Sequence, residues 1–247
     1  MSFTFTFFTK NPTLASWASS CGVSRIGVDL ESIGKKERQP SSFRISSHTI
    51  QDLSLIKNYI KPSQLFCRIN PINKLSQSEI EAVISVGVKH IMLPMFNSIE
   101  EVNLCENFIN RRANLIPLIE TEKSCKIVKE ISKTKTIKEV HVGLNDLHLS
   151  LKLENFYDVF DCDIFRRLMS DLSSYDLRFG LGGIAKYHDE ALALPSRENY
   201  KKYHETGASG AIISRSFISD ISCLNDFRVE IETARSFLPS GPDKSHG

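Results

Sequence analysis

The sequence predicts a single (β/α)8 barrel, and three observations support this prediction. The chain has 247 residues, a length at which α/β barrels form one domain. Eight short segments rich in β-forming residues alternate with amphipathic helical segments. Several of the eight are almost continuous apolar runs, such as FTFTFF, LIPLI and AIIS, which is typical of strands buried on both faces. A doubly wound open sheet is the alternative fold.

The predicted elements follow one another along the chain. Helices are favoured where the apolar period is helical, and two of them carry start or stop signals. Ser76 with Glu79 has the pattern of a capping box and Gly87 ends that helix, while Ser98 caps the next one. We expect helices at 76–88, 98–109, 121–132, 163–175, 197–207 and 224–238. We expect strands at 3–8, 25–29, 64–69, 90–93, 114–119, 139–142, 178–181 and 210–213.

Two connections in this pattern are unusual. Residues 31–48 form a long polar segment, and a loop of this length is typical of a lid or binding loop. It is followed by Thr49, which is expected to cap a helix with Asp52 at its third position. The stretch after Gly143 delays the next helix. We expect the barrel domain to span residues 1–238 and residues 239–247 to form a disordered tail.

Composition and charge exclude several classes of protein. The chain is 41% hydrophobic and 24% charged, which excludes disordered, collagen-like and coiled-coil proteins. Its 31 Lys and Arg nearly balance its 29 Asp and Glu, so nothing favours a nucleic-acid partner. No apolar run is long enough for a membrane helix. The start of the chain lacks the features of a signal peptide, and the six cysteines show no metal-binding spacing, so we expect a cytoplasmic protein with reduced thiols.

Polar residues gather where the predicted strands end. In α/β barrels the chemistry lies at the C-terminal ends of the strands, so these residues converge on one pocket. A barrel with a purely structural role has no need of so many ionisable groups there. The strand ends carry Asp29, Glu31, Arg68, Asn70, Pro94, Glu120, Glu122, Asp146, Gly182, Gly183 and Arg215.

Glu120 and Asp146 form the most informative pair. They are 26 residues apart, about one strand–helix–strand step, which places them at the ends of adjacent strands. Two converging carboxylates repel each other unless a cation or a proton lies between them. Mg²⁺ or Mn²⁺, completed by water and substrate oxygens, suits this ligand set. The alternative is that one of the two acids caps the helix that follows it.

Three further features have two readings each. Arg68 lies in a buried strand and must be paired, either with a substrate carboxylate or with an internal one. His48 is the best candidate for a proton-transfer group, and the alternative is an exposed loop histidine. Gly182 and Gly183 either let a ligand approach the backbone or make room inside the barrel.

Five motifs taken together resemble a known family. They are GVDLE (27–31), RINP (68–71), IMLPM (91–95), LIPLIET (115–121) and VGLNDL (142–147). In this order, each at a predicted strand end, they resemble the HpcH/HpaI aldolase and citrate lyase β-subunit family over roughly residues 20–218. The resemblance implies a (β/α)8 barrel of the phosphoenolpyruvate/pyruvate superfamily.

The resemblance also implies a site. A divalent metal would be held by Glu120 and Asp146, and Arg68 would bind the carboxylate and enolate oxygens of a 2-oxo acid. The backbone at Gly143, Leu144 and Asn145 would line the pyruvate site, beside Asn70, Pro94, Gly182 and Gly183. Members of the family commonly form trimers or hexamers and often exchange the last helix, here near 224–238, between subunits.

This sequence departs from the family in two ways. In the class II pyruvate aldolases the segment that matches 29–32 ends in a catalytic histidine, whereas here the residue is Ser32. The DLE string is nearer the citrate-lyase and malyl-CoA lyase branch, but we expect no C-terminal segment of the kind that closes over acyl-CoA in that branch. The catalytic candidates at this end are therefore Asp29, Glu31 and His48, or a metal-bound water.

The sequence thus predicts a metal-dependent carbon–carbon lyase of the aldolase type, acting on a small 2-oxo acid. The basic residues Lys35, Lys36 and Arg38 either close over an anionic second substrate or form a solvated loop. One alternative is an acyl-CoA lyase. The other is a barrel without catalysis that serves as a binding or assembly subunit.

Overall fold

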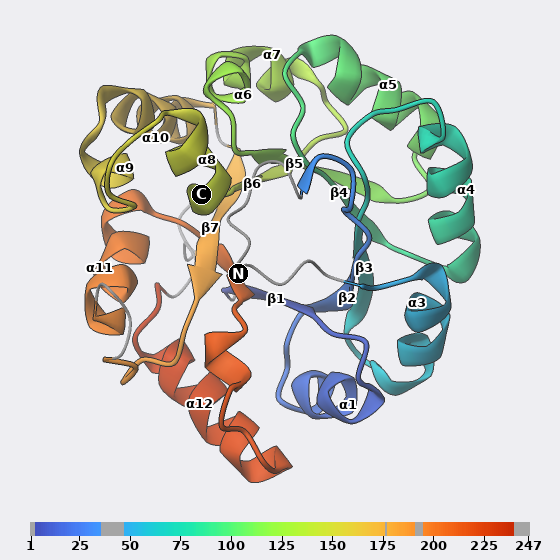
Figure 1. Cartoon of the computed structure of the whole chain (residues 1–247), viewed down its shortest axis with the longest axis vertical. Helices are drawn as coiled ribbons and strands as arrows, with labels where there is room; N and C mark the ends of the chain where they lie inside the picture. Colours follow the sequence, from blue (N-terminus) through green and yellow to red (C-terminus); the bar gives the residue numbers. More distant parts are fainter. Residues whose placement is uncertain (1–2, 36–46, 176, 191–194, 240–247) are drawn as a thin grey trace, which may run out of the picture.

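The eight strands close into a parallel barrel in the order β1 to β8, with β8 paired to β1. The structure is a computed structural model that describes residues 3–35, 47–175, 177–190 and 195–239. Figure 1 shows the strands around the centre and the helices in a ring outside them. The closed order confirms the predicted barrel and excludes the open sheet.

The strands and helices alternate along nearly the whole chain. The strands are β1 (Thr4–Phe8), β2 (Arg25–Asp29), β3 (Gln64–Arg68), β4 (His90–Leu93), β5 (Asn114–Ile119), β6 (Glu139–Val142), β7 (Arg178–Ile184) and β8 (Gly210–Ile213). The α-helices are α1 (Pro12–Ser20), α3 (Ile50–Ile56), α4 (Ser76–Val86), α5 (Ile99–Ile109), α6 (Glu122–Lys126), α7 (Val128–Lys133), α8 (Leu144–Ser150), α9 (Asp158–Asp161), α10 (Asp163–Ser174), α11 (Ser196–Thr206) and α12 (Leu224–Ser236). Two 3-10 turns, η1 (Lys57–Tyr59) and η2 (Ser216–Ile218), complete the described elements.

The hydrogen bonds at the helix ends confirm two of the predicted helix boundaries and contradict a predicted capping box. Ser98 caps α5 through a capping box, and Gly87 ends α4 with φ of 105°, as predicted. The predicted capping box at Ser76 is wrong: this residue lies inside α4, and its hydroxyl accepts a hydrogen bond from the Asn73 N–H. The carboxylate of Glu79 instead accepts hydrogen bonds from Asn70, beside the end of β3.

Three α-helices, α1, α8 and the short α9, lie where the sequence analysis placed none. Helix α1 begins after Asn11, whose side chain accepts hydrogen bonds from the N–H groups of Thr13 and Leu14. Helix α8 begins directly after Gly143, so the expected delay before the next helix is wrong. This early start lifts Asp146 into the first turn of a helix at the end of β6.

The barrel interior is layered, because alternate residues of each strand point inward. The middle layer is apolar and contains Phe66, Met92, Ile116 and Leu118, with Phe8 and Ile212 packed against it. Below it, at the N-terminal ends of the strands, Arg25 of β2 donates two hydrogen bonds of 2.7 Å to Glu139 of β6. His90 lies 2.6 Å from Gln64 in the same end of the barrel, and burial lowers its pKa to about 4. This end is thus closed by paired polar groups.

The glycines of β7 make room for the side chains of β6 and α8. A Cβ atom on Gly180 would overlap the imidazole ring of His141, and one on Gly182 would lie 2.7 Å from Leu144. Nε2 of His141 lies 3.0 Å from the carbonyl oxygen of Gly182, and burial lowers the pKa of this histidine to about 4. The reading in which the glycines make room inside the barrel therefore accounts for both contacts.

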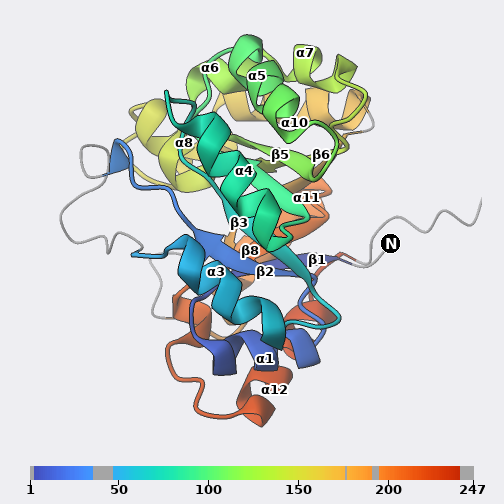
Figure 2. The ribbon, with the colours of Figure 1, turned by 90° about the vertical axis from the view of Figure 1, so that its right-hand side faces the viewer.

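Helix α12 covers its own barrel in this chain. Its buried residues are Phe227, Ile231 and Ala234, and the ring of Phe227 lies 6.0 Å from that of Phe7 in β1. Figures 1 and 2 both place α12 beside α1. Exchange of this helix between subunits stays a prediction. So does the end of the domain at residue 238, because residues 240–247 lie outside the described part of the chain.

All six cysteines are free, and Cys21, Cys67, Cys105 and Cys125 are buried. None of the described helices combines the length and the apolar character that a span of the bilayer requires.

Substitution of Gly180 tests the account of the barrel interior. Gly180→Ala is expected to lower the free energy of unfolding in urea by roughly 1–3 kcal/mol, because the added methyl group overpacks the layer against His141. In a His141→Ala background the same substitution is expected to cost much less, since the overlapping ring is gone. An equal cost in both backgrounds would contradict this account.

Candidate active site

Two neighbouring strands bring an acid and a base together at the C-terminal end of the barrel. Asp29 is the last residue of β2 and Arg68 the last residue of β3, and the register pairs them directly. Arg68 donates from Nε to Oδ1 of Asp29 at 2.8 Å and from Nη2 to Oδ2 at 2.7 Å. Of the two readings for Arg68, the internal ion pair is therefore present, and it holds the guanidinium in one orientation.

The charge of Asp29 is firmly fixed in this pair. Burial alone would favour the neutral acid, but the charges and hydrogen bonds of Arg68 and Lys35 hold the pKa of Asp29 well below the usual carboxyl range. The same pairing raises the pKa of Arg68 above its ordinary value despite burial. Asp29 is thus a permanent anion that positions Arg68.

Lys35 is a member of the site that sequence reasoning missed. It was expected in a loop over an anionic substrate or in a solvated loop, yet it is only 6% exposed. Its Nζ lies 2.8 Å from Oδ2 of Asp29 and 3.4 Å from Oε2 of Glu31. The four-residue spacing of Glu31 and Lys35 was the available signal. Lys36 and Arg38 lie outside the described residues.

Glu31 completes the cluster beside β2. It is 3% exposed, and its Oε2 lies 3.4 Å from Nε of Arg68 as well as from Lys35. These contacts are longer than those of Asp29, so Glu31 holds the two cations less tightly.

Glu120 is held by two special backbone positions. It follows β5, is 2% exposed, and accepts a hydrogen bond of 2.9 Å at Oε1 from the N–H of Met95. Met95 adopts a φ of 53°, a region that favours glycine, and this turn aims its N–H at the carboxylate. A Cβ atom on Gly143 would lie 2.9 Å from Oε2 of Glu120, so a side chain at this position would displace the carboxylate.

The carboxyl groups of Glu120 and Asp146 interact electrostatically. Burial and the negative charges of Asp146 and Glu31 together raise the pKa of Glu120 to about 8, against the opposing effects of Arg68 and the Met95 N–H. In the absence of a further cation, Glu120 is therefore protonated at neutral pH.

The cluster has more acids than bases. Among the described residues, four carboxyl groups (Asp29, Glu31, Glu120, Asp146) face two basic groups (Arg68, Lys35), which leaves two negative charges when all six are ionised. A divalent cation fits this deficit in charge and the oxygen donors of Glu120 and Asp146. In the described part of the chain no three His, Cys, Asp or Glu side chains converge to hold a metal. The two carboxylates would thus be its protein ligands, and Mg²⁺ commonly binds through one or two carboxylates plus substrate and water.

His48 lies beside this cluster, and its hydrogen bond defines its tautomer. Nδ1 accepts a hydrogen bond of 3.0 Å from the N–H of Asp29, so the neutral ring carries its proton on Nε2. Burial lowers the pKa of His48 more than Asp29 and Asp52 raise it. In this arrangement the ring is a hydrogen-bond donor at Nε2. Thr49 caps α3 with Asp52, as predicted.

The remaining predicted residues lie around the same end of the barrel. Oδ1 of Asn70 accepts hydrogen bonds from the N–H groups of Ser32 and Ile33, and its Nδ2 donates to Glu79, so its side chain fastens the loop after β2 to α4. Pro94 is buried directly after β4. Gly143 precedes Leu144 and Asn145 in the first turn of α8. Gly183 is exposed. Substrate binding by these residues stays a prediction.

Comparisons with known proteins concern the family and the fold of the chain. A family model described as HpcH/HpaI aldolase/citrate lyase matches residues 6–169. No curated protein sequence matches the chain. Many solved structures share the fold.

Three of these structures illustrate the likeness. A HpcH/HpaI aldolase/citrate lyase family protein from Burkholderia cenocepacia has a TM-score of 0.66 at 13% identity, over 88% of this chain and 90% of that one. A HpcH/HpaI aldolase from Desulfitobacterium hafniense has 0.65 at 14%, over 98% and 95%. The citrate lyase β subunit from M. tuberculosis, complexed with oxaloacetate and magnesium, has 0.62 at 17%, over 92% and 97%. At these identities the likeness shows the fold.

Replacement of Lys35 tests its burial in the cluster. Lys35→Met is expected to lower the free energy of unfolding by about 2 kcal/mol, because it leaves buried carboxylates with only one cation. The matched variant Lys126→Met, which breaks the exposed pair with Glu122, should change it by less than about 0.5 kcal/mol. Equal effects of the two variants in urea unfolding would show that Lys35 lies in solvent.

Proposed function

The chain belongs to the HpcH/HpaI aldolase/citrate lyase family, and from this premise we propose that it is a divalent-metal-dependent carbon–carbon lyase acting on a 2-oxo acid. The observation that carries the proposal is the buried cluster at the C-terminal end of the barrel, in which four acids face two bases. The M. tuberculosis protein of similar fold was solved with oxaloacetate, which is a 2-oxo acid, and with magnesium.

Glu120 and Asp146 are the residues that would hold the metal. Bound there, a divalent cation would supply Lewis-acid stabilisation to the 2-oxo oxygen of the substrate. Met95 and Gly143 keep the Glu120 carboxylate in place, the first through its N–H and the second through the absence of a side chain. Binding of the cation would replace the proton that Glu120 otherwise carries.

Arg68 would stabilise the negative charge that develops on the substrate. Its contacts with Asp29 and Glu31 engage Nε and Nη2, and we expect Nη1 to face the 2-oxo acid. Because Asp29 fixes the guanidinium before substrate binds, little reorganisation is needed as the charge forms. Asp29 is a positioning residue in this scheme.

Glu31 is the residue we assign as proton acceptor. A carboxylate as firmly ionised as Asp29 is a weak base, since basicity falls with pKa. His48 already uses Nδ1 to accept the N–H of Asp29 and presents a proton at Nε2, which suits a donor to substrate oxygen. Glu31 is buried in the cluster and more loosely paired, so it would take the hydroxyl proton of the bond that breaks.

Exchange of the methyl protons of pyruvate tests the proposal without knowledge of the second substrate. The purified protein with Mg²⁺ is expected to exchange these protons for deuterium in heavy water, as followed by NMR. A chelator, Glu120→Gln and Arg68→Ala should each reduce the rate by roughly 10² or more. The chelator removes the metal, Glu120→Gln removes a carboxylate that would hold it, and Arg68→Ala removes the guanidinium that faces the developing oxyanion.

The matched control is Glu122→Gln, which removes an exposed carboxylate two residues from Glu120 and should leave exchange unchanged. Exchange that persists in Glu120→Gln, or that is absent from the wild-type protein with metal bound, would contradict the proposal for pyruvate.

A further inference from the structure

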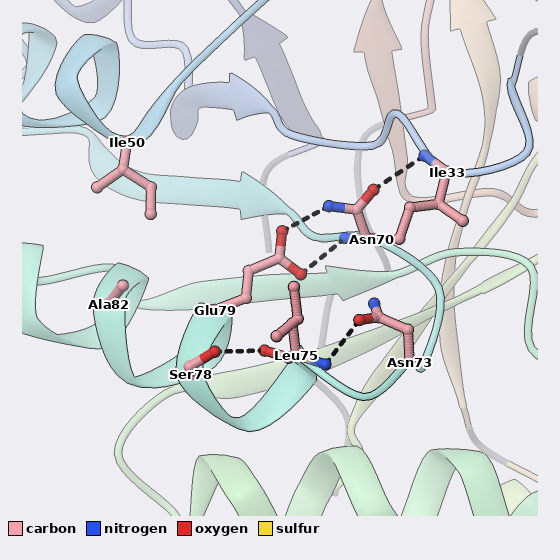
Figure 3. A pocket seen from close by; sticks show the side chains of 8 residues that line it. All are labelled: Ile33, Ile50, Asn70, Asn73, Leu75, Ser78, Glu79 and Ala82. Carbon is pink, nitrogen blue, oxygen red and sulfur yellow. Dashed lines mark hydrogen bonds between the residues drawn. The ribbon is translucent and has the colours of Figure 1, made fainter.

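A groove of about 300 Å³ lies beside the active site, between the loop after β2 and helices α3 and α4 (Figure 3). Its position at the C-terminal end of the barrel follows from Asn70, which comes two residues after β3, and Ile33, which lies in the loop after β2. Its volume is in the range of small-molecule subsites. The groove is lined by Ile33, Ile50, Asn70, Asn73, Leu75, Ser78, Glu79 and Ala82.

The polar groups of the groove are paired with one another or with the backbone. Glu79 accepts hydrogen bonds from Nδ2 and N–H of Asn70 at 2.7 and 3.2 Å (Figure 3). Oδ1 of Asn73 accepts the N–H of Leu75 at 2.8 Å, and Ser78 donates to the carbonyl oxygen of Leu75 at 2.8 Å. A ligand in the groove would therefore make mainly apolar contacts. The carboxyl of Glu79 also disfavours an anion.

Two large apolar side chains lie exposed at the groove. Leu75 is 71% exposed and Ile33 is 48% exposed, and Ile50 and Ala82 add further apolar surface. An exposed apolar surface with a polar surround is typical of a binding site. An uncharged aliphatic or aromatic group would bury this apolar surface, whereas a charged group would make no favourable contact with it.

One residue joins the groove to the catalytic cluster. Oδ1 of Asn70 accepts the N–H groups of Ser32 at 2.9 Å and of Ile33 at 3.1 Å. Along the chain, Asn70 lies two residues from Arg68 and Ile33 lies two residues from Glu31. The groove and the cluster therefore share two chain segments at the C-terminal end of the barrel, the residues after β2 and those after β3.

We propose that this groove is the subsite for the apolar chain of an uncharged aldehyde, the second reactant of the lyase reaction. The inference rests on the proposed function, which it deepens. In cleavage, the bond between C3 of the 2-oxo acid and the carbinol carbon breaks. Its electron pair stays with the 2-oxo acid fragment as the enolate, the hydroxyl proton passes to Glu31, and the aldehyde leaves along the groove. Glu31 then returns this proton to C3 of the enolate, which gives the free 2-oxo acid. In the addition direction Glu31 takes a proton from C3, and the resulting enolate attacks the aldehyde, whose oxygen receives the proton from Glu31.

Aldehydes of increasing chain length test the subsite in the addition reaction with pyruvate. The kcat/KM for hexanal is expected to exceed that for glycolaldehyde by at least about tenfold, because the longer chain fills the groove. Ala82→Phe, which fills the groove from α4, should remove most of this preference and leave pyruvate methyl exchange unchanged. Ser85→Phe adds the same ring to the exposed surface of the same helix and should change neither.

Binding of hexan-1-ol, measured by saturation-transfer NMR, tests the groove independently of catalysis. The alcohol is expected to bind the wild-type protein and Ser85→Phe and to lose binding in Ala82→Phe. Equal binding by all three proteins, or an equal preference for hexanal in Ala82→Phe, would overturn the inference even if pyruvate exchange is present. Absence of exchange together with loss of hexanol binding in Ala82→Phe would overturn the proposed function and the assignment of the aldehyde.

Discussion

Four carboxyl groups and two basic side chains share one buried end of the barrel, and their charge balance is the constraint on which the site depends. The register of β2 and β3 places Asp29 beside Arg68. In the segment after β2, Lys35 forms ion pairs with both Asp29 and Glu31. Glu120 is held on the far side by an N–H from a residue with positive φ. Because burial removes the solvation of these groups, each needs a partner, and among the described residues the direct partner of the Glu120 carboxylate is the neutral N–H of Met95.

The rest of the barrel isolates this charge. An apolar layer around Phe66 and Met92 fills its middle, and the pair formed by Arg25 and Glu139 closes its other end. The buried histidine His141 remains neutral at physiological pH because burial lowers its pKa to about 4. The electrostatic field of the acid cluster is therefore directed toward the C-terminal end of the barrel, where a cation and a 2-oxo acid would bind.

The sequence predicted the strands well because their apolar runs and period are local signals, and it predicted which strand ends converge because a parallel barrel places them at one end. It missed α1, whose segment PTLASWASS has a weak apolar period, although Asn11 was a readable cap. It assigned Glu79 to a capping box, whereas the carboxylate binds Asn70 through a contact that only the tertiary fold creates. Lys35 was missed for the same reason, since loop composition resembles a solvated segment and burial is decided by the partners.

We propose that a divalent cation completes the acid cluster and displaces the proton of Glu120. Binding of Mn²⁺, measured by electron paramagnetic resonance between about pH 6 and pH 9, tests it most directly. Since Glu120 has a pKa raised to about 8, affinity should rise by up to about tenfold per pH unit below pH 8 and level off above it. Glu120→Gln should weaken binding and flatten this dependence, whereas Glu122→Gln should match the wild-type protein. Absence of Mn²⁺ binding, or an affinity that Glu120→Gln leaves unchanged, would contradict the claim.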